Sequence, residues 1–90
     1  MPSVKDVLVK KPSEKEIASC KQWPIWTCEP SVFDWVYTDK ETCLLLEGKV
    51  TVSDENGSVS FGAGDFVVFP KYLKCSWNIA EAVKKHYAFG

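Results

Sequence analysis

Residues 41–70 form a strand–turn–strand pattern that constrains the fold more than any other part of the chain. Two apolar runs rich in Val, Leu and Phe flank a turn that is built around Asn56-Gly57. Short apolar runs bounded by turn residues indicate antiparallel strands. An Asn-Gly pair favours positive φ and therefore predicts a tight hairpin. Gly48, inside the first run, permits a bend or a bulge.

The rest of the chain continues this pattern. Ser13 and Glu16 have the spacing of a capping box, which predicts a short helix reaching about Ser19. Alternation or short apolar runs predict strands at Val4–Val9, Trp23–Glu29, Val32–Tyr37, Glu41–Leu46, Lys49–Ser53, Ser58–Phe61, Phe66–Phe69, Lys74–Ile79 and Val83–Phe89. About eight or nine short strands at roughly ten-residue spacing predict an all-β sandwich or barrel with one short N-terminal helix.

Composition narrows the class of protein. With 90 residues and a net charge of −1, we expect one domain, with an N-terminal strand and helix over residues 1–22 and a barrel core over 23–90. The absence of a basic patch argues against a nucleic-acid partner, and no apolar run is long enough for a membrane helix. No secretion signal is evident, so we expect a cytoplasmic protein whose four cysteines are reduced rather than paired in disulfides.

The spacing of glycines and proline resembles that of the cupins. Glu41 is separated by six residues from Gly48, as in the first cupin motif, and Gly64-Asp65 is separated by four residues from Pro70, as in the second. From about Trp23 onward the chain resembles a small jelly-roll cupin, of the subfamily that includes ureidoglycine aminohydrolase and ethanolamine-utilisation cupins. The fold that this implies is a single-domain jelly roll. It implies less about activity, since cupins host enzymes, binding proteins and storage proteins.

The resemblance also implies where a metal would bind. A typical cupin holds a divalent metal with three His and one Glu. Here those positions fall on Trp35, Tyr37, Cys75 and Glu41, and Tyr72 replaces a motif glycine. An alternative register puts the first two histidine positions on Asp34 and Val36, but the aromatic face favours the first choice. The standard site is therefore absent, and we predict no cofactor.

Three interpretations of the barrel interior remain open. In the first, a metal-free pocket is lined by aromatic residues, with Glu41 and Cys75 supplying polarity. In the second, a variant site of Glu41, Cys75 and His86, with Cys43 or Tyr37 as further candidates, binds a metal such as Zn²⁺. In the third, the aromatic residues are only core. The candidate lining residues of the first interpretation are Trp35, Tyr37, Tyr72 and Trp77.

Charged residues in the predicted strands limit these interpretations. A buried Glu41 is costly unless it is paired. Lys85 shares a face with Tyr87 and could pair with Glu41 and keep it ionised; the alternative is a hydrogen bond from Tyr37 or from a backbone amide.

His86 lies on the opposite face from Tyr87, so we expect it at the surface or in an interface. Cys43 is expected in the core, and no chemistry is expected of Cys20 or Cys28.

Two functions follow as hypotheses. The first is a small-molecule enzyme in which Glu41 is the general acid or base and Cys75 is a nucleophile or ligand. The second is a non-catalytic module that binds a small sugar-like or ureido-type ligand. Either could be a homodimer that pairs through the strand at Val4–Val9. The predicted ligand-binding residues in both cases are Trp35, Tyr37, Cys43, Tyr72, Trp77 and Lys85.

Overall fold

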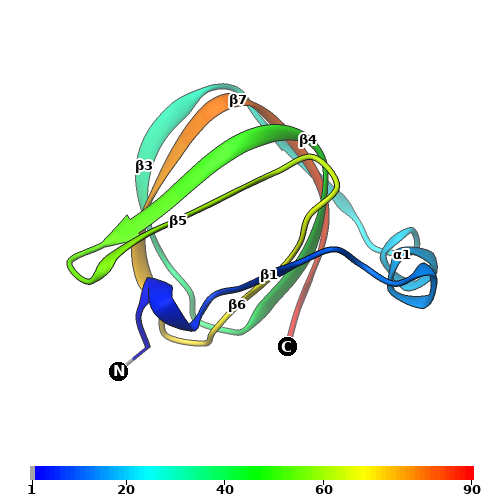
Figure 1. The fold of residues 1–90 in the computed structure, drawn as a ribbon, viewed down its shortest axis with the longest axis horizontal. Helices are drawn as coiled ribbons and strands as arrows, with labels where there is room; N and C mark the ends of the chain where they lie inside the picture. Colours follow the sequence, from blue (N-terminus) through cyan, green and yellow to red (C-terminus); the bar gives the residue numbers. More distant parts are fainter. Residues whose placement is uncertain (1) are drawn as a thin grey trace.

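Two long strands run through the whole molecule and hold its sheet together (Figure 1). A computed structural model describes residues 2–90. The elements in chain order are η1 (Val4–Asp6), β1 (Leu8–Lys10), α1 (Glu14–Cys20), β2 (Ile25–Cys28), β3 (Ser31–Val36), β4 (Glu41–Asp54), β5 (Gly57–Gly62), β6 (Phe66–Phe69) and β7 (Lys74–Phe89). This confirms the predicted all-β class with a single short α-helix among the described residues.

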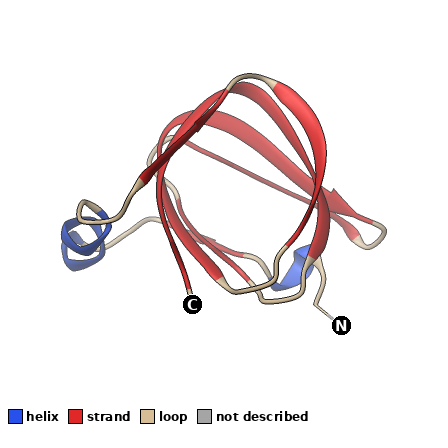
Figure 2. Cartoon of the chain, turned by 180° about the vertical axis from the view of Figure 1, so that it is seen from behind, coloured by secondary structure: helices blue, strands red, loops and turns tan. Residues whose placement is uncertain are grey.

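The long strands β4 and β7 pair with each other and take part in both halves of the sheet. In one half the order is β1-β6-β4-β7-β2, and in the other β5 pairs with β4 while β3 pairs with β7. All of these pairs are antiparallel. Seen from behind, the strands curve around a common interior, and helix α1 lies outside it (Figure 2). The arrangement is that of a jelly roll.

The bend in β4 lies at Gly48, where the sequence predicted a bend or bulge. The pairing of β4 with β7 changes register between Leu45 and Val50. Gly48 has φ +114°, and a Cβ there would lie 2.8 Å from the carbonyl oxygen of Ala82. Only glycine meets both conditions without strain, so this position fixes where the sheet turns from one half to the other.

Several predicted strand boundaries are wrong. Residues 2–90 form seven strands rather than nine, because the predicted pairs of short strands at 41–53 and at 74–89 are each one continuous strand. Bulges keep β4 and β7 paired across the bend. Alternation alone cannot distinguish a bulge within one strand from a loop between two strands. The N-terminal strand begins only at Leu8, since Ser3 and Asp6 form a capping box that turns Val4–Asp6 into a 3₁₀ helix. The tight hairpin is present, but its loop is Glu55-Asn56, since Asp54 pairs with Gly57.

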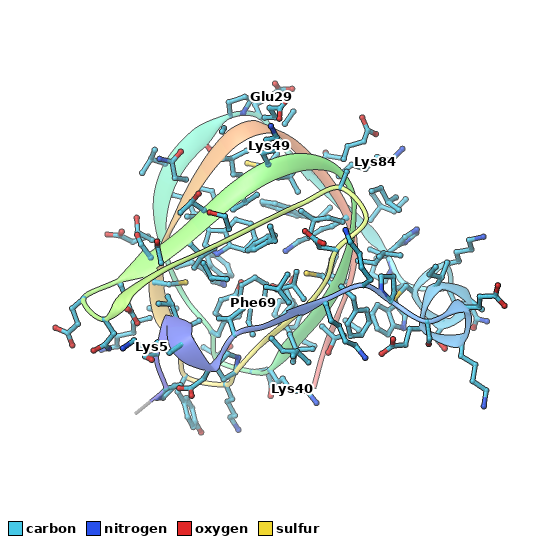
Figure 3. The ribbon with its side chains drawn as sticks, viewed as in Figure 1. Lys5, Glu29, Lys40, Lys49, Phe69 and Lys84 are labelled. Atoms are coloured by element: carbon cyan, nitrogen blue, oxygen red, sulfur yellow. The ribbon has the colours of Figure 1, made fainter. Side chains whose placement is uncertain are left out.

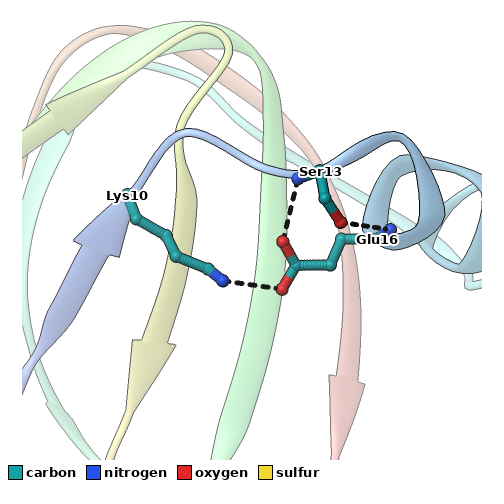
Figure 4. A network of polar contacts seen from close by, with 3 residues as sticks. All are labelled: Lys10, Ser13 and Glu16. Carbon is teal, nitrogen blue, oxygen red and sulfur yellow. Dashed lines mark hydrogen bonds and ion pairs between the residues drawn. The ribbon is translucent and has the colours of Figure 1, made fainter.

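The predicted helix forms where its capping box indicated (Figure 4). The Ser13 hydroxyl accepts from the Glu16 amide, and the Glu16 carboxylate accepts from the Ser13 amide at 2.9 Å. The Lys10 ammonium also contacts Glu16 at 2.9 Å. The Ser13 amide and then Lys10 lower the pKa of the Glu16 carboxyl. Cys20 at the helix end packs with Leu44 and Phe66, so the helix covers the outer face of the sheet. No helix among residues 2–90 is long and apolar enough to span a bilayer.

Aromatic side chains fill the interior. Phe69, labelled within the ring of strands in Figure 3, stacks on Tyr37 with ring centroids 4.9 Å apart. Phe61 and Trp77 contact Phe69 edge-on or tilted, at 5.7 and 5.6 Å. Offset and edge-to-face pairs of this kind add to the free energy gained by burial. Two members of this cluster, Tyr37 and Trp77, also line a cavity beside it.

Tyr72 is the one non-glycine residue with positive φ among residues 2–90, at φ 72°. It occupies the position where the resembled motif has glycine. Its amide donates to the Tyr37 carbonyl at 2.7 Å, and the Lys71 ammonium lies 4.9 Å from its ring centroid. The left-handed conformation costs a side-chain residue about 1 to 3 kcal/mol.

We expect Tyr72→Gly to be more stable than Tyr72→Ala by about 1 kcal/mol, because both remove the ring but only glycine relieves the backbone strain. Urea denaturation of the two variants measures the difference. Equal stabilities would show that the left-handed conformation at residue 72 carries no strain.

Candidate ligand pocket

A cavity of about 220 Å³ opens inside the sheet, beside the aromatic core. Apart from Glu41 and Lys85, every residue that lines it is aromatic. The lining residues are Trp26, Phe33, Trp35, Tyr37, Glu41, Trp77, Lys85, Tyr87 and Phe89. Apolar walls with a few polar groups are typical of small-molecule sites, and this cavity is smaller than the usual range of about 300 to 1,000 Å³, so it suits only a small ligand.

Strand register brings these side chains together from distant parts of the sequence. Phe33 pairs with Trp77 across β3 and β7, and Trp26 pairs with Lys85 across β2 and β7. Alternate residues of a strand face the same side, which places Lys85, Tyr87 and Phe89 of β7 along one wall. The site is therefore built mainly from four strands of the sheet, and Tyr37, from the segment between β3 and β4, is the one lining residue outside them.

Glu41 and Lys85 form a buried ion pair in this cavity. The Lys85 ammonium donates to Oε2 of Glu41 at 2.7 Å, and the two residues are only 5% and 3% exposed. The same ammonium lies 4.9 Å from the ring centroid of Trp26 and 4.8 Å from that of Trp77. The pairing of Lys85 with Glu41 that the sequence suggested is present. It holds two charges in surroundings where an unpaired charge would be very costly.

Tyr37 adds a neutral polar group beside the pair. Its side chain is buried, and its ring lies edge-on to Trp35 at 6.4 Å. Burial and then the negative charge of Glu41 raise the pKa of the Tyr37 phenol far above its usual value. The phenol therefore keeps its proton near Glu41 at neutral pH and can act only as a neutral donor or acceptor.

Cys75 does not line the cavity, so the pocket predicted around Glu41 and Cys75 is centred on Glu41 and Lys85 instead. The Cys75 thiol donates to the Trp35 carbonyl at 3.8 Å. Burial and then the charge of Asp54 raise the pKa of this thiol to about 11. The indole of Trp77 opposes that rise, but its contact with the thiol is too poor for a hydrogen bond, and its buried Nε1 has no partner among the described residues. A protonated thiol is a weak nucleophile.

Three other predicted residues also lie outside the cavity lining. Cys43 is fully buried in the core, where burial raises its pKa to about 12. Tyr72 is 60% exposed and borders a separate shallow hollow near Lys74. We expected His86 at the surface or in an interface. Instead it is buried within the chain, and its Nδ1 lies 2.9 Å from the Trp23 carbonyl oxygen. It does face away from Tyr87, but the segment around Trp23 covers that outer face.

Four lining residues were absent from the sequence-based set: Trp26, Phe33, Tyr87 and Phe89. For three of them a signal existed. Phe33 alternates with Trp35 and Tyr37, and Tyr87 and Phe89 alternate with Lys85. Trp26 lies in a short strand after Pro24, and only its pairing with β7 shows which way it faces.

The comparisons with known proteins identify the family. Residues 16–87 match the family model of the EutQ-like cupin domain. The chain belongs to the EutQ-like cupin family. A structure of a DUF861 family protein from Thermotoga maritima is 44% identical to this cupin, with a TM-score of 0.89, and covers 94% of this chain and 100% of its own. No curated protein sequence matches the chain.

Two EutQ proteins share the fold at lower identity. The Clostridium difficile EutQ structure is 18% identical with a TM-score of 0.66, over 72% of this cupin and 52% of its own chain. An ethanolamine utilization protein Q from Salmonella typhimurium is 23% identical with a TM-score of 0.65, over 72% of this chain and 53% of its own. The cupin thus spans about half the length of these EutQ proteins, and the likeness shows the fold alone.

The residues at the family's metal-ligand positions do not fit a divalent metal. Trp35 offers no metal-binding atom, and Tyr37 and Cys75 hold their protons because burial raises their pKa values. Glu41 is the remaining oxygen donor, and the ammonium of Lys85 already takes the place of a cation beside it. Among residues 2–90, no three His, Cys, Asp or Glu side chains come together, so Glu41, Cys75 and His86 do not form the variant site.

Removing one member of the ion pair should be strongly destabilising. Lys85→Met leaves the Glu41 charge buried without a partner, and we expect a loss of about 3 to 5 kcal/mol in the free energy of unfolding. The double variant with Glu41→Gln should lose less than the sum of the two single changes, because neither charge is then left alone. Chemical denaturation of the four proteins measures the coupling. Lys84→Met, which changes a lysine on the outer face, is the control. If the losses of stability in Lys85→Met and Glu41→Gln simply add in the double variant, the pairing is contradicted.

The raised thiol pKa values predict a loss of stability in alkali. Cys43 has a pKa of about 12 against an ordinary 9.0, so the folded thiol stays protonated while the unfolded one ionises. The stabilisation that this protonated thiol gives the folded state is complete below about pH 9 and is lost as pH rises toward 12. We expect the free energy of unfolding of Cys43→Ala to fall less steeply between these limits than that of the wild type. Val52→Ala, a core change without a titrating group, should keep the wild-type slope.

Proposed function

We propose that this cupin binds a small organic molecule in the cavity around Glu41 and Lys85. The observation that carries the proposal is a buried ion pair that borders an otherwise aromatic cavity. The aromatic faces would contact the body of the ligand, while Glu41 and Lys85 hydrogen-bond one polar group. A pocket used only as packing would have no need for two charges at its wall.

The pair also limits the chemistry of the ligand. Glu41 and Lys85 together carry no net charge, so a ligand with a single charge would meet one repulsive partner. A neutral group with both a donor and an acceptor, such as an amide or a ureido group, can contact the carboxylate and the ammonium together. The resemblance to the subfamily that includes ureidoglycine aminohydrolase supports the ureido group within this proposal.

A second candidate is catalysis of proton transfer on the same ligand. A carboxylate, an ammonium and a phenol line one cavity, in Glu41, Lys85 and Tyr37. Groups of this kind serve as general acids and bases when they lie within reach of a substrate. The reaction would be an isomerisation or a hydrolysis of a small polar metabolite, with Glu41 rather than Cys75 as the acting group.

A screen of small amides and ureides tests the binding function. We expect at least one to raise the melting temperature and to change tryptophan fluorescence, since a ligand that binds only the folded state stabilises it. Trp35→Ala should weaken binding by about fivefold, as expected for the loss of one aromatic contact worth about 1 kcal/mol. Tyr72→Ala, which removes an aromatic ring outside the pocket, is the matched control.

The absence of any stabilising compound, or equal effects of the two variants, would contradict the proposed pocket. Turnover is read separately, by following each bound compound with NMR. Product that forms with wild type and not with Glu41→Gln would favour the catalytic candidate, and a bound but unchanged compound would favour the binding module.

A further inference from the structure

We propose that Lys85 captures small aldehydes or ketones in this cavity by forming an imine through its side-chain nitrogen. The inference rests on the proposed function, since a carbonyl compound must first enter the same pocket. It goes further in naming a covalent step and the class of substrate that takes part in it.

The position of Lys85 distinguishes it from the other lysines of the chain. It is the only buried lysine among residues 2–90, and it lines the aromatic cavity. Lys84, its neighbour in β7, lies on the other face of the strand and does not line that cavity. An amine held in an apolar pocket, away from bulk water, is the usual setting of lysines that form imines with carbonyl substrates.

Glu41 is placed to move the protons that the step requires. Its Oε2 lies 2.7 Å from Nζ of Lys85, so it can accept a proton and leave a neutral amine. The same carboxyl group can then return the proton to the oxygen of a bound carbonyl.

The atoms and charges of the step balance without a further reagent. The neutral nitrogen attacks the carbonyl carbon, a C–N bond forms, and the carbonyl oxygen takes the proton from Glu41. Glu41 then carries one of the remaining nitrogen-bound protons to the new hydroxyl group, which leaves as water. Overall, the ammonium and the carbonyl compound give a protonated imine and one water molecule.

The surroundings of Lys85 suit the product as well as the reactant. A protonated imine carries the same single positive charge as the ammonium that it replaces. Glu41 remains as its counter-ion, and the faces of Trp26 and Trp77, now 4.9 and 4.8 Å from Nζ, stabilise a cation at this position. The cavity of about 220 Å³ restricts the substrate to a small carbonyl compound.

Reductive trapping tests the proposal. The full chain is incubated with dilute benzaldehyde and sodium cyanoborohydride, and benzylated lysines are located by mass spectrometry of peptides. We expect Lys85 to be modified at least about tenfold more than any other lysine, because a bound carbonyl reacts as an intramolecular partner. Lys85→Arg keeps the positive charge and should lose this selective adduct, whereas Lys84→Arg should keep it.

Benzyl alcohol, which cannot form an imine, separates this inference from the proposed function. If the alcohol binds, as read by tryptophan fluorescence, but benzaldehyde modifies all lysines equally, imine formation is overturned and the pocket stands. If neither compound binds or reacts selectively, both are overturned for this class of ligand. The peptide map is read on the wild-type chain, so the test holds even where Lys85→Arg does not fold.

Discussion

The buried ion pair between Glu41 and Lys85 is the interaction on which the rest of the site depends. Two charges cannot remain in an aromatic interior unless each is matched, and here one hydrogen bond of 2.7 Å and two indole faces provide the match. The pair in turn fixes its neighbours. Trp26 and Trp77 must keep their faces toward the ammonium, and Tyr37 must remain protonated beside the carboxylate. The cavity is therefore held open by electrostatics as well as by packing.

The fold supplies this arrangement through its two long strands. Glu41 begins β4 and Lys85 lies near the end of β7, and their pairing on the inner face requires the two strands to keep register along the sheet. Gly48 allows β4 to bend from one half of the sheet to the other. Because all lining residues except Tyr37 lie on strands, their side chains have few alternative positions.

The charged residues of this pocket differ from the metal site that the resemblance to typical cupins would imply. Glu41 stands where the resemblance to typical cupins would put a metal-binding glutamate, and the charge that faces it in this structure is the ammonium of Lys85. A lysine carries a proton and a nucleophilic nitrogen that a metal ion does not. The proposed ligand binding, proton transfer and imine formation all depend on these two properties of Lys85.

The sequence by itself determined the features that depend on local spacing. Alternation identified the extended segments but not where each strand begins and ends. The capping box located helix α1, Gly48 marked the bend, and the shared face of Lys85 and Tyr87 suggested the partner of Glu41. Only the tertiary structure decided which residues meet. It placed Trp26 in the cavity, Cys75 outside its lining and His86 beneath the segment around Trp23. The physical reason is that alternation fixes the two faces of a strand, whereas the register between strands and the segments that cover them fix what each face contacts.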